Sequence, residues 1–245
     1  MNANQRIVLI GADTPRARAY ATSLERAGLG PVEGVFYGEP SPAKQRTASE
    51  GRMFGEVWLP FFDASVADIF TRNGWPCRWL QAEKINNQLC VAALRESGAS
   101  LAVFAGRGGE IVSSEVLDQG VPVLHMHPGR LPDQRGSTTI YYSILEGKSC
   151  AVSALLMDKE IDAGPVVAIN AYAIPTSDVD VDVIYDCAIR ADTMVKVLRH
   201  LRQHGELPRA KKSDKSAGRL FYVVHPLLKH LALLSSKKRS MYPVQ

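Results

Sequence analysis

Two histidines and one aspartate occur where the sequence pattern would bring them together. The stretch from Val121 to Gly136 reads VPVLHMHPGRLPDQRG, and its apolar start predicts a buried strand that ends at Pro128. Because side chains two apart in a strand point to one face, His125 and His127 are expected together at the strand end. Asp162, in a charged turn after a second apolar run, is the carboxylate expected to pair with His127. Imidazole and carboxylate groups so placed can transfer protons.

The elements that must position these residues alternate between strand and helix. The expected strands are 6–10, 32–37, 75–80, 101–105, 121–127, 150–157 and 165–173, and the expected helices are 15–27, 63–72, 86–98, 138–145 and 178–204. This alternation predicts an α/β fold, a Rossmann-like open, mostly parallel twisted sheet with helices on both faces. Ligands bind at the carboxyl ends of the strands in such sheets, which is where both histidines fall.

Other features narrow the class of protein. The turn from Gly11 to Thr14 lacks GxGxxG, so a dinucleotide cofactor is disfavoured. Asn86 is expected to cap the helix predicted at 86–98. Residues 38–60 are predicted to form a loop long enough to contact a substrate. The four cysteines are far apart in sequence, form no CxxC pair and are expected to be small buried side chains, so neither a disulfide framework nor a zinc site is indicated.

Composition and charge divide the chain unevenly. With 245 residues, of which 46% are hydrophobic and 22% charged, the chain suits one catalytic domain, 1–204, and a short basic C-terminal appendage, 205–245. The appendage has nine Lys and Arg against two acids and a net charge of +7, with a strand expected at 220–224 and amphipathic turns at 227–234. A solubilising tail is favoured over one that binds RNA phosphates or an acidic membrane. No segment is long enough to span a bilayer and no leader is apparent, so a cytoplasmic protein is expected.

Two motifs in this order and spacing resemble a known family. The segments HPGRLPDQRG and MDKEIDAGPVV resemble the signature of the folate-dependent formyltransferases, Asn-x-His-Pro-x-x-Leu-Pro-x-x-(Arg/Lys)-Gly followed by Asp-x-Gly-(Pro). The resemblance covers roughly Ala82 to Val167 and is to the catalytic domain of methionyl-tRNA and sugar N-formyltransferases. This chain departs from the pattern at His125, which replaces the family's Asn.

The resemblance implies an enzyme that transfers a formyl group from 10-formyltetrahydrofolate, as donor, to a primary amine. It implies catalytic roles for His125, His127 and Asp162, and a folate site formed by eight residues of two loops. These residues are Gly106, Arg107, Gly108, Gly109, Ile111, Asp158, Glu160 and Ile161. If His125 replaces the Asn as a donor to the formyl oxygen, an imidazole near its ordinary pKa of about 6.5 predicts a pH-dependent step between roughly 6 and 8.

The acceptor and the chemistry are less defined. A small or nucleotide-linked amine is favoured, either an amino sugar or a secondary-metabolite amine, while tRNA is disfavoured because about forty residues are too few for the C-terminal domain of methionyl-tRNA formyltransferase. Two alternatives remain. One is a metal-dependent enzyme that uses His125, His127 and Asp162 as ligands. The other is a folate-binding protein with a lapsed catalytic site.

Overall fold

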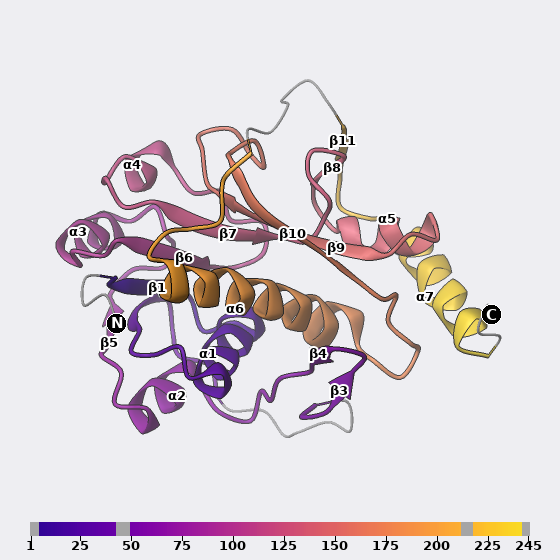
Figure 1. Ribbon diagram of the computed structural model, residues 1–245, viewed down its shortest axis with the longest axis horizontal. Coiled ribbons are helices and arrows are strands. Elements are labelled where there is room, and N and C mark those ends of the chain that lie inside the picture. Colours follow the sequence, from indigo (N-terminus) through magenta and orange to yellow (C-terminus); the bar gives the residue numbers. More distant parts are fainter. Residues whose placement is uncertain (1–4, 43–49, 212–217, 242–245) are drawn as a thin grey trace.

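A computed structural model describes residues 5–42, 50–211 and 218–241 of the chain (Figure 1). Within these residues, one sheet contains seven strands in the order β10-β9-β7-β6-β1-β2-β5. Their bounds are β1 Ile7–Gly11, β2 Glu33–Tyr37, β5 Cys77–Leu80, β6 Leu101–Ala105, β7 Val123–His127, β9 Cys150–Leu156 and β10 Val166–Tyr172. Strands β5, β2, β1, β6 and β7 are parallel, β9 is antiparallel to β7, and β10 is antiparallel to β9. The predicted mostly parallel, Rossmann-like sheet is confirmed.

Helices cover both faces of this sheet, as predicted (Figure 1). The helices are α1 Pro15–Ala27, α2 Val66–Arg72, α3 Gln88–Glu96, α4 Ser114–Leu117, α5 Thr139–Leu145, α6 Asp186–His204, which follows a π-helical turn Val181–Tyr185, and α7 Pro226–Met241. Alternate residues of β1 enter two separate hydrophobic cores, Leu9 with α1, α2, α5 and α6, and Ile10 with α3 and α4. The prediction of a helix from residue 178 was wrong, because the α-helix begins eight residues later, at Asp186.

Local sequence signals fix several helix ends. The Thr14 side chain accepts a hydrogen bond from the Ala17 N–H at the start of α1, and Gly28, with φ 63°, ends that helix in the left-handed conformation. The cap of α3 differs from the prediction. Asn87, not Asn86, caps this helix by accepting a hydrogen bond from the Leu89 N–H. The side chain of Asn86 instead forms hydrogen bonds with backbone groups of the segment that follows the loop after β6.

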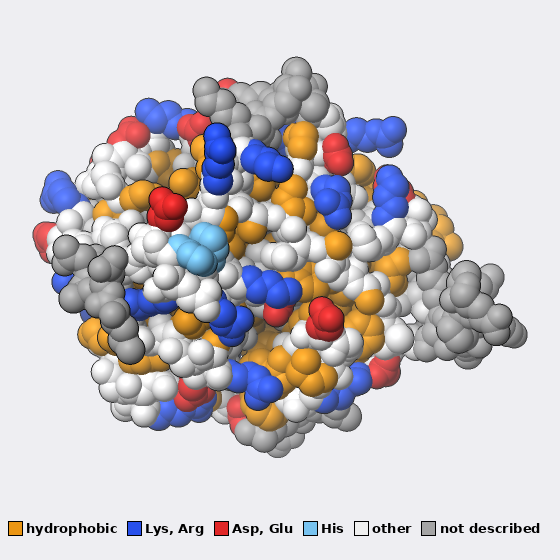
Figure 2. Space-filling view, viewed as in Figure 1, with side chains coloured by type: hydrophobic (Ala, Val, Ile, Leu, Met, Phe, Trp, Pro, Cys, Tyr) orange, Lys and Arg blue, Asp and Glu red, His pale blue; other side chains and the backbone are white. Residues whose placement is uncertain are grey.

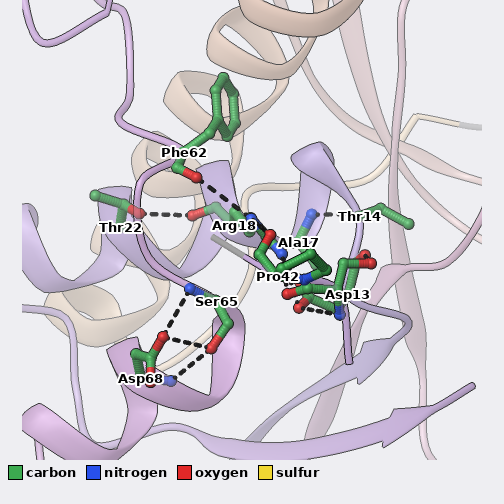
Figure 3. Close-up of polar contacts among 10 residues, drawn as sticks. Asp13, Thr14, Ala17, Arg18, Thr22, Pro42, Phe62, Ser65 and Asp68 are labelled. Atoms are coloured by element: carbon green, nitrogen blue, oxygen red, sulfur yellow. Dashed lines mark hydrogen bonds and ion pairs between the residues drawn. The ribbon is translucent and has the colours of Figure 1, made fainter. Parts of the chain in front are cut away.

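A buried ion pair ties the β1–α1 turn to the segment that follows β2 (Figure 3). The Arg18 guanidinium donates to both carboxylate oxygens of Asp13, at 2.7 and 3.0 Å, and also to the carbonyl oxygens of Ser41, Pro42 and Phe62. Both oxygens of the Asp13 carboxylate are therefore occupied by contacts within the protein.

The predicted loop 38–60 contains a short hairpin, β3 Met53–Phe54 and β4 Val57–Trp58. Residues 43–49 of this loop lie outside the described part of the chain.

The C-terminal segment packs against the main body. Strand β11, Arg219–Phe221, pairs in parallel with β8, Gln134–Gly136, a strand that the sequence did not predict. Helix α7 packs on α5 and is longer than the turns expected at 227–234, while the strand expected at 220–224 is shorter and begins earlier. No helix in the described ranges is long and apolar enough to cross a membrane. Cys77 is exposed, which corrects the expectation that all four cysteines are buried.

Candidate active site

His127 is buried at the end of β7 and contacts two acceptors. Its Nε2 lies 2.6 Å from the backbone carbonyl oxygen of Gln134, and its Nδ1 lies 3.2 Å from Oδ1 of Asp162. The other carboxylate oxygen of Asp162 accepts from the Gly136 N–H at 2.9 Å. The strand β7 and the turn after β9 therefore each contribute one side chain to this arrangement, and β8 contributes two backbone groups.

The hydrogen bonds of His127 limit where its protons lie. A carbonyl oxygen only accepts, so Nε2 carries a hydrogen, and Nδ1 either donates to Asp162 as part of an imidazolium or offers a lone pair. Burial alone would raise the pKa of Asp162, but the hydrogen bond and charge of His127, with the Gly136 N–H, outweigh it and lower that pKa to about 2. The carboxylate is thus ionised at neutral pH and positioned to stabilise a positive charge on His127.

Backbone geometry at two positions makes this pairing possible. Asp162 has φ 54°, a left-handed conformation that non-glycine residues adopt infrequently. Gly129 follows the strand end, and a Cβ there would lie 2.7 Å from Nε2 of His127 and 2.7 Å from the Gln134 carbonyl oxygen. A side chain at residue 129 would therefore displace the hydrogen bond that orients the imidazole.

His125 lies beside this pair and differs from it in its surroundings. One ring nitrogen each from His125 and His127 and a carboxylate oxygen of Asp162 all lie within 4.8 Å of one another, so the structure brings together the three residues predicted from sequence. The His125 Nδ1 is buried and has no hydrogen-bond partner among the described residues. Burial lowers the pKa of His125 well below 6.5, and the charges of Arg190 and Arg16 lower it further. These effects favour the neutral ring of His125, so the pH-dependent step that an ordinary pKa would give is not expected.

The three residues line a cleft of about 810 Å³. Six of the eight predicted folate-site residues also line it: Arg107, Gly108, Gly109, Ile111, Glu160 and Ile161. Asp158 lines an adjoining, mostly apolar pocket of about 100 Å³, which also borders His125. Gly106 is not among the residues that line either space. A Cβ on Gly106 would lie 2.3 Å from the Phe104 ring and 2.6 Å from the Tyr37 hydroxyl, so a glycine is needed there for packing.

Three further features of the site were not predicted from the sequence. Glu110 holds the glycine-rich loop, because its carboxylate accepts from the N–H groups of Ile85 and Arg107 and from the Tyr37 hydroxyl. Gln134 and Gly136 act through backbone atoms, for which the sequence gives no signal. Arg16 and Arg190 also line the cleft. They are far apart in sequence, so the sequence does not predict that they are close to each other in the structure.

Comparison with known proteins finds partial sequence matches to formyltransferases. No family model matches the chain. Over 155 residues it is 30% identical to a methionyl-tRNA formyltransferase of Campylobacter curvus, a match that covers 62% of this chain and 46% of that protein. Over 102 residues it is 34% identical to the methionyl-tRNA formyltransferase of Levilactobacillus brevis, covering 41% and 32%. The chain thus spans about half or less of the length of these curated relatives.

Solved structures share the fold over most of the chain. A sugar N-formyltransferase from a Shewanella species matches with a TM-score of 0.57 and 17% identity, covering 94% of this chain and 87% of that one. Glycinamide ribonucleotide transformylase 1 from Symbiobacterium toebii matches with a TM-score of 0.56 and 17% identity, covering 87% and 96%. The fold is that of an α/β formyltransferase domain. The partial sequence matches and the shared fold support a formyltransferase family for this chain, which confirms the resemblance predicted from its paired motifs.

Proposed function

We propose that this protein transfers a formyl group from 10-formyltetrahydrofolate to a primary amine. The observation that carries the proposal is the buried His127–Asp162 pair, which lies in one cleft with the unpartnered ring of His125. The amine nitrogen would attack the formyl carbon and form a tetrahedral oxyanion. The bond between that carbon and the folate nitrogen then breaks, and the proton lost by the amine passes to the folate nitrogen.

The chain's own groups suit these steps. His127, held by the Gln134 carbonyl and the ionised Asp162, can stabilise the oxyanion through the positive charge of its imidazolium form and take part in moving the proton. The Nδ1 of His125 has no hydrogen-bond partner among the described residues, so this ring nitrogen is free to donate a hydrogen bond to the formyl oxygen. This is the position at which the family pattern has Asn.

The folate would bind in the cleft between the loop after β6 and the turn after β9. The apolar pocket beside His125 includes Phe104, Val112 and Leu155, with loop backbone at its edge. Gly108 and Gly109 leave open space where a side chain would project, so a flat ring can approach the main chain. One structural neighbour, an N-formyltransferase from Helicobacter canadensis, was solved with folinic acid and dTDP-3-aminofucose (TM-score 0.55, 13% identity, 89% and 71% covered).

The acceptor that we favour is an amine on a small or nucleotide-linked molecule, such as an amino sugar. Sugar N-formyltransferases among the structural neighbours support this choice. The curated relatives that act on methionyl-tRNA keep tRNA as the alternative acceptor. Figure 2 shows Lys and Arg side chains scattered over one face of the molecule, among exposed hydrophobic side chains, and not gathered into one basic patch.

The test combines binding with turnover. Saturating 5-formyltetrahydrofolate should raise the melting temperature, because a ligand that binds only the folded state stabilises it by about 2.7 kcal/mol at a hundred times its Kd. Ile111→Asp should abolish this shift, since Ile111 is exposed and lines the cleft, while the control Ile169→Asp on β10 should retain it. A panel of amines incubated with 10-formyltetrahydrofolate should give one product heavier by a formyl group. Binding without turnover of any amine would favour a lapsed site.

The geometry of His125, His127 and Asp162 also favours one competing function, that of a metal-dependent enzyme. Their ligand atoms lie within 4.8 Å of one another, and the hydrogen bond from Nε2 of His127 to a carbonyl leaves Nδ1 as a possible ligand atom. The charges of Arg16 and Arg190 near His125 oppose a cation there. Metal analysis of the purified protein, and folate-dependent transfer measured after chelation, would decide between the two functions.

A further inference from the structure

Two facing helices carry charged side chains at the edge of the cleft. Arg16 and Tyr20 lie one turn apart on α1, and Asp186 and Arg190 lie one turn apart on α6, which packs against α1. Arg190 is fixed, because its Nη1 donates to the Met126 carbonyl oxygen at 2.7 Å and its Nε lies 2.8 Å from a carboxylate oxygen of Asp186. Among the described residues, Arg16 makes no such hydrogen bond, and its Nε is buried.

Buried polar atoms without partners gather at this place. Among the described residues, the Nε of Arg16, the hydroxyl of Tyr20 and the Nδ1 of His125 are buried and make no hydrogen bond. Buried polar groups in folded proteins are nearly always hydrogen-bonded. A cluster of unpartnered polar atoms beside a cleft therefore indicates that a bound ligand supplies the missing hydrogen bonds. All three atoms belong to residues that interact electrostatically with Arg190 or Arg16.

Two arginines share one carboxylate at this place, because Arg16 and Arg190 both interact with Asp186. Three other acids of the cleft and its surroundings have partners of their own: Asp13 pairs with Arg18, Asp162 with His127, and Asp182 with Lys229 and the Tyr141 hydroxyl. Burial lowers the pKa of Arg16, and repulsion from Arg190 lowers it further. A desolvated cation without a full counter-charge is unfavourable, and a bound anion would remove that cost.

We propose that Arg16 and Arg190 form a subsite for an acidic group of the acceptor, a carboxylate or a phosphate, next to His125. A guanidinium donates parallel hydrogen bonds to either group. The position of Arg16 in the first turn of α1 places the positive end of that helix at the same spot. This inference rests on the proposed formyl transfer, and it defines the acceptor as a molecule with an amine and an acidic group close together.

Pairs of amines that differ only in the acidic group test the subsite. Glucosamine 6-phosphate against glucosamine probes a phosphate, and β-alanine against β-alaninamide probes a carboxylate. The acidic member of one pair should have a kcat/KM at least tenfold higher, and the pair that shows the preference identifies the group. If no amine is formylated, the proposed function itself fails. If amines are formylated and the members of both pairs react equally, only the subsite is wrong.

A variant of Arg16 separates binding from folding. Arg16→Met removes an arginine that has no hydrogen-bond partner, so the melting temperature should stay the same or rise, while the preference for the acidic amine should fall at least tenfold. Arg16→Lys should keep part of the preference. The control Arg95→Met, at an exposed position on α3, should change neither quantity. Equal losses of activity toward both members of a pair, or a marked drop in the melting temperature, would show a structural role for Arg16 and overturn the subsite.

Protection by a simple anion gives a readout that needs no turnover. Inorganic phosphate or acetate should raise the melting temperature of the wild-type protein and should have little effect on Arg16→Met. An equal effect of these anions on both proteins would contradict a subsite at Arg16.

Discussion

The two ring nitrogens of His127 each face an acceptor, and because Asp162 is one of these acceptors we expect it to affect the rate of formyl transfer. Asp162→Asn removes the negative charge that stabilises a proton on His127 while keeping a side chain of the same shape. Formyl transfer should slow by roughly a hundredfold or more, the usual loss for a positioned acid–base group. The measurement is kcat with saturating donor and amine, with circular dichroism as the control for folding. A rate near that of the wild type would remove Asp162 from the mechanism.

The same carboxylate should affect stability in acid. Its pKa is lowered to about 2 in the folded protein, from an ordinary value of 3.8. A carboxyl group with a lowered folded pKa stabilises the protein above its unfolded pKa, and this contribution is lost as the pH falls from about 4 to 2. The shift corresponds to about 2 kcal/mol. Wild-type protein should therefore lose about that much more unfolding free energy than Asp162→Asn between pH 5 and 2 in denaturant titrations. Parallel curves would contradict this.

His125 allows a test of donor exchange. His125→Asn restores the residue of the family pattern and should keep much of the activity, whereas His125→Ala should lose about 3 kcal/mol of transition-state stabilisation, roughly a hundredfold in rate. Because burial and the charges of two arginines favour the neutral ring of His125, the wild type and His125→Asn should have the same pH–rate profile from pH 6 to 8. If both variants fold and are equally inactive, His125 does not act as a donor that Asn can replace.

At the scale of elements, the pairing of the short strands β8 and β11 holds a backbone group that positions Asp162. Gly136 lies in β8 with φ 99°, and its N–H donates to Asp162. A Cβ at this position would lie 2.1 Å from the carbonyl oxygen of Phe221 on β11. Gly136→Ala should therefore separate the strands and shift the Asp162 contact, with a loss of about 1–3 kcal/mol in stability and at least tenfold in rate. Thermal unfolding and kcat measure these effects. Gly108→Ala, where a Cβ contacts nothing within 4 Å, should leave the melting temperature unchanged.

The elements that the sequence predicted well are those with local signals. Pro15 defined the start of α1, and an unbroken apolar run defined β6, so both were predicted at their observed ends. Strand β8 has three residues and pairs with β11 only after a long stretch of intervening chain, so no periodicity predicts β8 or this pairing, although a strand was predicted near β11. The His127–Asp162 contact was predicted from strand alternation and the paired motifs. Arg16 and Arg190 were not, because only tertiary packing of α1 on α6 brings them to the cleft.

At the scale of the whole molecule, the C-terminal segment contributes to the cleft. Leu220, Phe221, Tyr222 and Val223 line it, and the Phe221 ring packs on Tyr142 with centroids 4.6 Å apart. The Val224 N–H donates to the Thr138 hydroxyl, and Lys229 contacts the Asp182 carboxylate and the Tyr141 ring. The boundary predicted at residue 204 therefore marks a change in composition, because the segment that follows it is basic. The described residues of that segment nevertheless line the cleft and contact the main body.

Truncation tests whether residues 1–204 form an independent unit. A chain that ends at residue 204 lacks β11 and α7, so it exposes the face of α5 that α7 covers and leaves β8 without its partner strand. We expect a lower melting temperature and a transfer rate reduced at least tenfold, because the Gly136 N–H would no longer be held against Asp162. Lys229→Met in the full chain is the control. It removes one contact of α7 and should have a small effect, since exposed ion pairs contribute about 1 kcal/mol or less. A truncated protein with an unchanged melting temperature and rate would establish 1–204 as a complete catalytic domain.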